Sequence, residues 1–492
     1  MTVETNPKPV RKTLGLTGIT INAMALTAPG AFLWLLYQVQ ASAGFGGVAD
    51  IWPGVLLALL GALLTALSFG ELARRFPDAG FRSAYHFADR VFAAQKTPRH
   101  RSLARLAKFV AGWSAHLYYW IYPGVLVAFM GVLADYLLRF FGYHPTVFGE
   151  VLLAASLAAF VGFLALRGIT GSTTSSVVLN TIQLLTLVIF AVFAIAFRLV
   201  NPAGFPAQAW TYSSVVQVLL PHSLGGALFQ GALAMILMAG FESSTALGAS
   251  AANPQRDIPR GAILALVIQG AFAYLLGYFA AGFALNAQID PVGSHAPIGD
   301  LAVQVGNALL GGYGPTLMLT IGFTVVLALL GGTLTATNNG VRISFAMALD
   351  EEMPDVLGLL HPQYATPYYT VILLSVVSAL VGAAGIIGGL PVLMGIILAS
   401  NLGAFLLYAL LSVLTISTFV GDASFNIVRH ILLPLTGLVI NLGIVIAVAM
   451  IGLSAGGIIS QASLIAFGLA GFWLVVSVAY YSARRGRRQQ AG

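Results

Sequence analysis

The feature that most constrains this chain is a series of apolar segments, each close to 20 residues long and separated by polar connections. A helix needs about 20 apolar residues to cross the hydrocarbon core of a bilayer. Only 8% of the 492 residues are charged and 58% are hydrophobic, whereas soluble proteins carry about 25% charged residues. We therefore expect an all-α integral membrane protein with twelve spans, at residues 15–39, 51–73, 108–139, 148–167, 176–199, 221–249, 260–284, 313–346, 367–389, 391–418, 430–453 and 458–482.

The distribution of lysine and arginine predicts the orientation of these spans. When twelve spans are laid out, all of the 23 basic residues except Arg139 and Arg198 fall on one side. Basic residues concentrate in the cytoplasmic loops of membrane proteins. We therefore expect a multi-pass protein of the cytoplasmic membrane, with an N-terminal tail (1–14) and a C-terminal tail (483–492) that are both cytoplasmic.

The sixth expected span contains an interruption and an acidic residue. Ala239-Gly240 lowers the helix propensity near its middle, and the hydroxyls of the following Ser243-Ser244-Thr245 can bond to freed backbone groups. Glu242 lies within the span, where a carboxylate costs about 2.5–3.5 kcal/mol and therefore marks a candidate functional site. The alternative is that Glu242 only holds the two helix halves together by hydrogen bonds.

The first expected span has a second interruption, at Pro29-Gly30. Proline lacks an amide hydrogen and clashes with the preceding helical turn, and glycine permits unusual backbone angles. The two interruptions occupy matching places if five helices repeat. Interrupted helices in corresponding positions are the best sequence indication of a transporter's binding site.

Several segments, taken in order, resemble the amino acid–polyamine–organocation superfamily of permeases. They are Gly70–Gly80, Gly240–Ser244 with Asn253–Arg260, and Arg342–Ala348 with Met353-Pro354, His361-Pro362 and Thr366-Pro367. The resemblance implies two inverted five-helix repeats, at 15–199 and 221–418, followed by two extra helices within 430–482. It also implies a substrate site between the first, third, sixth, eighth and tenth helices.

The resemblance further implies which residues bind the substrate. Backbone amides of the first interruption would hold its carboxylate, at Thr27, Ala28, Gly30 and Ala31. Carbonyls of the sixth helix would hold its amine, at Ala239, Gly240 and Phe241, with Phe241 either a gate or a core residue. The chain departs from the family pattern at Pro29, which removes one amide and leaves room for a substrate without the usual carboxylate. The eighth helix carries Gly331-Gly332 where a sodium site would need hydroxyls, so we expect protons rather than sodium.

Other polar residues within the spans are candidate site residues. His116 can contact substrate or carry a proton because imidazole titrates near neutrality, or it can be a hydrogen-bonded core histidine. Asn401 can reach a central pocket, although interhelical hydrogen bonding explains most such amides. Glu71 and Arg74 can form an inner-gate ion pair. The aromatic run 118–122 can form a cation–π wall or pack against lipid.

No motif indicates catalysis or a cofactor. There is no phosphate-binding loop ending in Gly-Lys-Ser/Thr, no metal-ligand spacing and no cysteine, and the basic residues follow topology rather than indicating nucleic acid. We expect a secondary transporter for an amino acid or a small related monoamine, coupled to protons or working by exchange. The alternatives are a polyamine transporter, a solute-sensing membrane receptor with the same fold, and a passive channel.

Overall fold

The computed structural model describes residues 14–26, 31–43, 48–76, 83–93, 98–168, 173–247 and 251–491. Within these residues the regular structure is helical, and the only β-type pairings are three isolated bridges. The α-helices are α1 (Leu16–Leu26), α2 (Ala31–Ala41), α3 (Ile51–Arg75), α4 (Ser83–Ala93), α5 (Pro98–Phe140), α6 (Val147–Leu166), α7 (Thr173–Val200), α8 (Val215–Leu219), α9 (Leu224–Met238), α10 (Pro254–Val267), α11 (Leu276–Ala284), α12 (Pro297–Leu309), α13 (Gly314–Leu349), α14 (Tyr368–Ile387), α15 (Gly389–Phe419), α16 (Leu433–Ala447) and α17 (Gly457–Ala491). The 3-10 segments are η2 (Ala207–Ala209), η3 (Phe241–Leu247) and η5 (Asp355–Gly358), and the π-helical segments are η4 (Ile268–Leu275), η6 (Val428–Leu432) and η7 (Val448–Gly452).

Eleven helical segments among the described residues are long and apolar enough to cross a membrane. They match, to within a few residues at most ends, the expected spans from 51–73 onward, so these eleven predictions are confirmed. The range of the first expected span holds two helices of 11 residues each, α1 and α2. Residues 27–30, between these two helices, lie outside the described residues.

The 43-residue helix α5 forms the centre of the bundle and packs against α13, α14 and α15. Glycine allows a close approach between α5 and α15. A Cβ atom on Gly403 of α15 would lie 2.7 Å from both the Ser114 carbonyl oxygen and the Tyr118 amide nitrogen of α5. Small residues of this kind let the backbones of membrane helices approach each other closely.

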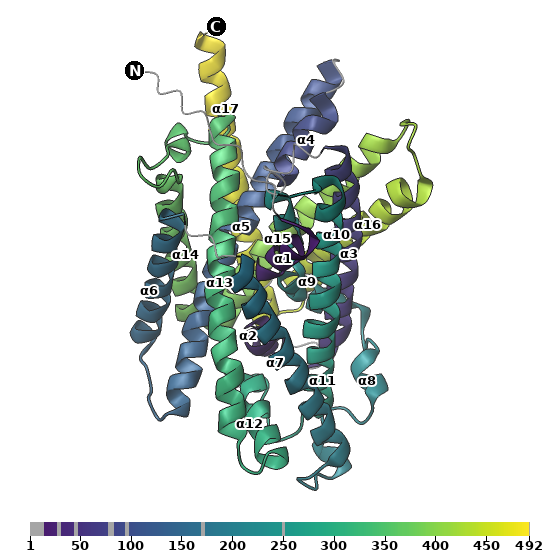
Figure 1. The fold of residues 1–492 in the computed structure, drawn as a ribbon, viewed down its shortest axis with the longest axis vertical. Helices are drawn as coiled ribbons and strands as arrows, with labels where there is room; N and C mark the ends of the chain where they lie inside the picture. The colour runs from purple at the N-terminus through teal and green to yellow at the C-terminus, as the bar shows by residue number, and fades with distance from the viewer. Residues whose placement is uncertain are drawn as a thin grey trace.

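The helices at the edge of the bundle expose apolar side chains. Leu152 on α6, Leu380 on α14, Val439 on α16 and Val475 on α17 are all more than half exposed, and α6, α14 and α16 lie at the margins of the bundle (Figure 1). Because acyl chains are as apolar as these side chains, the exposed surface suits contact with lipid.

The bundle has two ends, named here after a helix that lies at each. The C-terminal end of α17 lies at one end, here called the α17 end, and α8 and α12 lie at the other, the α12 end (Figure 1). At the α17 end, the acidic connection after α13 is joined to basic residues of two other helices. Lys108 Nζ lies 2.9 Å from an Asp350 oxygen, and an Arg484 nitrogen lies 2.7 Å from an Asp355 oxygen.

Candidate functional site

The sixth span is interrupted where the sequence predicted it. Helix α9 ends at Met238, and Ala239 adopts an extended conformation with φ −68° and ψ 132°. Gly240 follows with φ +133°, a backbone conformation that side chains disfavour and glycine accepts. The chain then continues as the 3-10 segment η3, in which the Ser243 amide donates to the Gly240 carbonyl at 3.0 Å. The interruption therefore separates α9 from a differently wound second half.

Glu242 lies in the first turn after this interruption and is 3% exposed. The Tyr119 hydroxyl of α5 donates to its Oε1 at 2.8 Å, and the Tyr408 hydroxyl of α15 donates to its Oε2 at 3.1 Å. The Gly240 amide also donates to Oε2, at 3.0 Å. A buried carboxylate needs such donors to offset the loss of water. Glu242 thus joins the interrupted helix to two others, as the helix-linking alternative expects.

Several buried polar atoms of α5, η3 and α15, the elements that meet at Glu242, have no hydrogen-bond partner among the described residues. They are Tyr118 Oη, Ser243 Oγ, Ser244 Oγ and Asn401 Oδ1. A buried polar group without a partner costs about 1–3 kcal/mol, so a ligand or water that supplies the missing bonds is favoured there. The three hydroxyls can donate or accept and the Asn401 amide oxygen can accept, which suits a polar ligand.

Phe241 and Asn401 both lie in the interior, as a role near the site requires. The Phe241 ring packs edge-on against Phe69 of α3, with centroids 6.1 Å apart, and lies 5.3 Å from the Tyr408 ring. Asn401 Nδ2 donates to the carbonyls of Ala232 and Leu233 on α9, at 2.7 and 3.2 Å. Asn401 therefore bonds α15 to the helix that precedes the interruption.

Of the four candidate residues of the first interruption, only Ala31 belongs to the described residues. Thr27, Ala28 and Gly30 lie outside the described residues, and Ala31 is the first residue of α2. Helix α1, which precedes them, packs against η3 and α10. The Gln269 side-chain amide also donates to the Met24 carbonyl of α1, at 2.7 Å. The end of α1 is thus held beside the second half of the sixth span.

His116 lies in a different part of the interior from Glu242. Its Nδ1 lies 2.8 Å from the Gly112 carbonyl and its Nε2 lies 3.0 Å from the Ser344 hydroxyl of α13. The Trp120 indole also donates to Ser344 Oγ, at 3.0 Å. Both ring nitrogens are therefore engaged, as in the core-histidine alternative. His116 also lines a cavity of about 160 Å³ between α5 and α17, whose wall includes Trp473.

The two candidate gate residues form the expected ion pair. Arg74 donates to Glu71 Oε1 at 2.8 Å, one turn along α3, and the Glu71 side chain is 17% exposed. His430 Nε2 lies 3.9 Å from the other Glu71 oxygen, so the pair reaches η6. The neighbouring Arg75 contacts Asp422 at 3.1 Å. The geometry joins α3 to the connection between α15 and α16, while a gating role stays a prediction.

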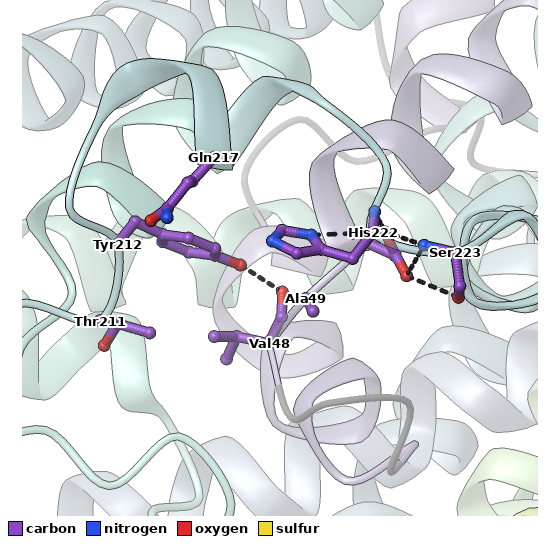
Figure 2. Close-up of a pocket in the computed structure, with 8 residues that line it drawn as sticks. Val48, Ala49, Thr211, Tyr212, Gln217, His222 and Ser223 are labelled. Carbon is purple, nitrogen blue, oxygen red and sulfur yellow. Dashed lines mark hydrogen bonds and ion pairs between the residues drawn. The ribbon is translucent and has the colours of Figure 1, made fainter.

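A cavity of about 570 Å³ opens at the α12 end, and no motif in the sequence indicates it. Figure 2 shows Tyr212 donating to the Val48 carbonyl and His222 and Ser223 facing the same carboxylate. That carboxylate is Asp50, whose oxygens accept from the His222 and Ser223 amides and the Ser223 hydroxyl. Asp50 thereby holds the start of α9 beside the start of α3.

Comparison with known proteins decides the family. A family model described as amino acid permease matches residues 18–489. The chain belongs to the amino acid permease family. Members of this family are transporters and not enzymes, so this permease is a multi-pass membrane transporter. The resemblance found from the motifs is therefore confirmed.

The curated relatives of this permease carry diverse names. The branched-chain amino acid permease BcaP of Bacillus subtilis is 25% identical over 379 residues, covering 72% of this chain and 74% of its own. The low-affinity putrescine importer PlaP of Escherichia coli is 25% identical over 391 residues, covering 77% and 76%. The methylthioribose transporter of B. subtilis is 23% identical over 401 residues, covering 79% and 77%.

Proposed function

We propose that this permease is a secondary transporter for an amino acid or a small related monoamine, working by proton coupling or exchange. The observation that supports this most is Glu242, a buried carboxylate at the interruption of the sixth span, with Tyr119 and Tyr408 as donors. Such a group can accept either a proton or an ammonium ion. Release of either would change which helices the carboxylate joins.

The architecture that goes with this function is the inverted repeat. We propose two five-helix repeats, 15–199 and 221–418, two further helices within 430–482, and both tails on the cytoplasmic side. The packing of α1 against η3 supports this arrangement, because it holds the end of α1 next to the second interrupted span. Substrate would then lie between residues 27–31 and residues 239–241, and alternating access would rock one bundle against the other.

The charge at the site favours a substrate with one ammonium group. Among the described residues, the buried acids are Asp50, Asp135, Glu150, Glu242 and Asp257. Of these, Glu242 alone accepts a hydrogen bond from the backbone of the interruption. A second ammonium group, as in a polyamine, would lack a counter-charge there. The aromatic rings near Glu242 can add cation–π attraction for a single ammonium.

Uptake into proteoliposomes tests this proposal. Labelled leucine, ethanolamine and putrescine cover the neutral amino acid, the monoamine and the diamine classes. We expect saturable uptake and counterflow for leucine or ethanolamine, driven by an inward proton gradient and not by sodium. Saturable uptake of putrescine alone would establish the polyamine alternative. Binding without flux would indicate a sensor, and flux that never saturates would indicate a channel.

A further inference from the structure

A group of ionisable side chains lies at the α12 end, far along the chain from Glu242. Asp135 of α5 is its centre, with a side chain that is completely buried. Its Oδ1 lies 2.6 Å from Arg139 Nε, one turn along α5. Its Oδ2 lies 2.5 Å from Nδ1 of His295, a residue in the connection between α11 and α12. Both carboxylate oxygens are thus engaged, one of them across 160 residues of sequence.

A third helix contributes to the same group. Glu150, in the first turn of α6, interacts electrostatically with Asp135, His295 and Arg139. These four residues are here called the Asp135 cluster. Its members come from α5, α6 and the α11–α12 connection, so it joins three elements at one point.

Two further contacts hold the same connection to the bundle. Asp300, in the first turn of α12, accepts from the Tyr136 hydroxyl of α5 at 2.9 Å and from the Ser294 hydroxyl at 2.5 Å. The Gln38 side chain of α2 donates to the Val292 carbonyl at 2.8 Å. The connection is therefore fastened to α5 and also to α2, the second half of the first expected span.

The charges of the Asp135 cluster balance only when it holds a proton. With His295 neutral, two carboxylates, Asp135 and Glu150, face one guanidinium, Arg139. One additional proton on His295 or on a carboxyl group removes the excess negative charge. Imidazole is the side chain whose ordinary titration falls between about pH 5 and about pH 8, and the His295 side chain is 43% exposed, so protons reach it from solvent.

We propose that the Asp135 cluster is a proton-binding site, separate from Glu242, that fastens the α11–α12 connection to α5. With the proton bound, a cationic imidazole bonds the buried carboxylate, and charge-assisted hydrogen bonds are the stronger kind. When the proton leaves the imidazole, no cation offsets the second of the two carboxylates, Asp135 and Glu150, and the bond from His295 weakens. The connection then loosens as pH rises. This site does not depend on which solute the permease carries.

The absence of native cysteines makes the test direct. Spin labels at Phe140→Cys, at the exposed end of α5, and Ala308→Cys, on the exposed face of α12, report the distance between the two elements. The protein is reconstituted in lipid nanodiscs, and distance distributions are recorded from about pH 5 to about pH 8. We expect a short, narrow distance at the acid limit and a growing longer population as pH rises.

Three variants make the result specific. His295→Gln keeps a neutral hydrogen-bonding group and should remove the pH response. His295→Lys supplies a permanent cation and should keep the short distance throughout the range. His222→Gln changes another half-exposed histidine at the same end and should leave the parent's response intact. The proposal is overturned if the distance between the two labels in the parent does not change with pH, or if it changes in His295→Gln as it does in the parent.

Discussion

The hydrogen bonds to Glu242 make a quantitative prediction about Tyr408. A bond to a charged acceptor contributes about 1.5–3 kcal/mol in proteins, and interhelical bonds measured in membranes reach about 1.7 kcal/mol. We therefore expect Tyr408→Phe to lower the free energy of unfolding by about 1–2 kcal/mol. Tyr119→Phe should cost at least as much, because its bond to Glu242 is 2.8 Å rather than 3.1 Å long.

The double-mutant cycle with Glu242→Gln isolates the bond itself. Against a neutral acceptor the hydroxyl contributes about 0.5–1.5 kcal/mol, so the cost of Tyr408→Phe should shrink in that background. Reversible unfolding in mixed micelles, followed by circular dichroism, measures all four proteins. Tyr278→Phe is the matched control, since the buried Tyr278 hydroxyl has no partner among the described residues and its loss should cost little. An equal cost of Tyr408→Phe in both backgrounds would refute the assignment of the bond to Glu242.

Three further changes test the packing and the two ends. Gly403→Val should lower the free energy of unfolding by about 1–3 kcal/mol, because the added side chain forces α15 away from the α5 backbone. Gly443→Val, whose added Cβ meets nothing within 4 Å, should leave the free energy of unfolding almost unchanged in the same unfolding assay. Asp50→Asn should weaken the hold on the start of α9 and cost about 1–3 kcal/mol, and an unchanged melting temperature would contradict that role. Hydrogen bonds from Ser424 hold the pKa of Asp422 below its usual value, so its contribution is present above the ordinary carboxyl range and is lost as pH falls through the lowered pKa. Asp422→Asn should therefore flatten stability against pH only in that acid range, and a difference confined to neutral pH would contradict the assignment.

Much of the fold could be predicted from the sequence because membrane spans depend on local composition. The apolar runs from 51–73 onward became helices close to their expected ends, since a lipid-exposed backbone must satisfy its own hydrogen bonds. The interruption at Ala239-Gly240 was also predictable, because glycine there lowers helix propensity and a carboxylate follows two residues later. These features need no knowledge of distant contacts.

The partners of the site residues could not be predicted because they depend on tertiary contacts. Tyr408 lies 166 residues from Glu242, and nothing in its local sequence distinguishes it from a core tyrosine. The sequence did contain a general indication. A buried carboxylate needs hydrogen-bond donors, and tyrosine is one of the few side chains that combine a hydroxyl donor with a largely apolar body. The same holds for Asp135 of α5 and His295 of the α11–α12 connection, which meet only in the folded chain. His116 is the opposite case. Its imidazole made it a candidate for substrate contact or proton transfer, but its ring nitrogens contact the Gly112 carbonyl and the Ser344 hydroxyl.

Proton-driven accumulation in proteoliposomes, compared between the parent and Glu242→Gln, tests the central claim most directly. With an inward proton gradient and the labelled solute that the parent carries, the parent should accumulate it and Glu242→Gln should not, while counterflow without a gradient persists in the variant. Asp355→Asn, which alters an 80% exposed acid at the α17 end of the same bundle, serves as the control and should retain gradient-driven accumulation. Unchanged accumulation by Glu242→Gln, with the parent's pH dependence, would remove Glu242 from the coupling role and contradict the account.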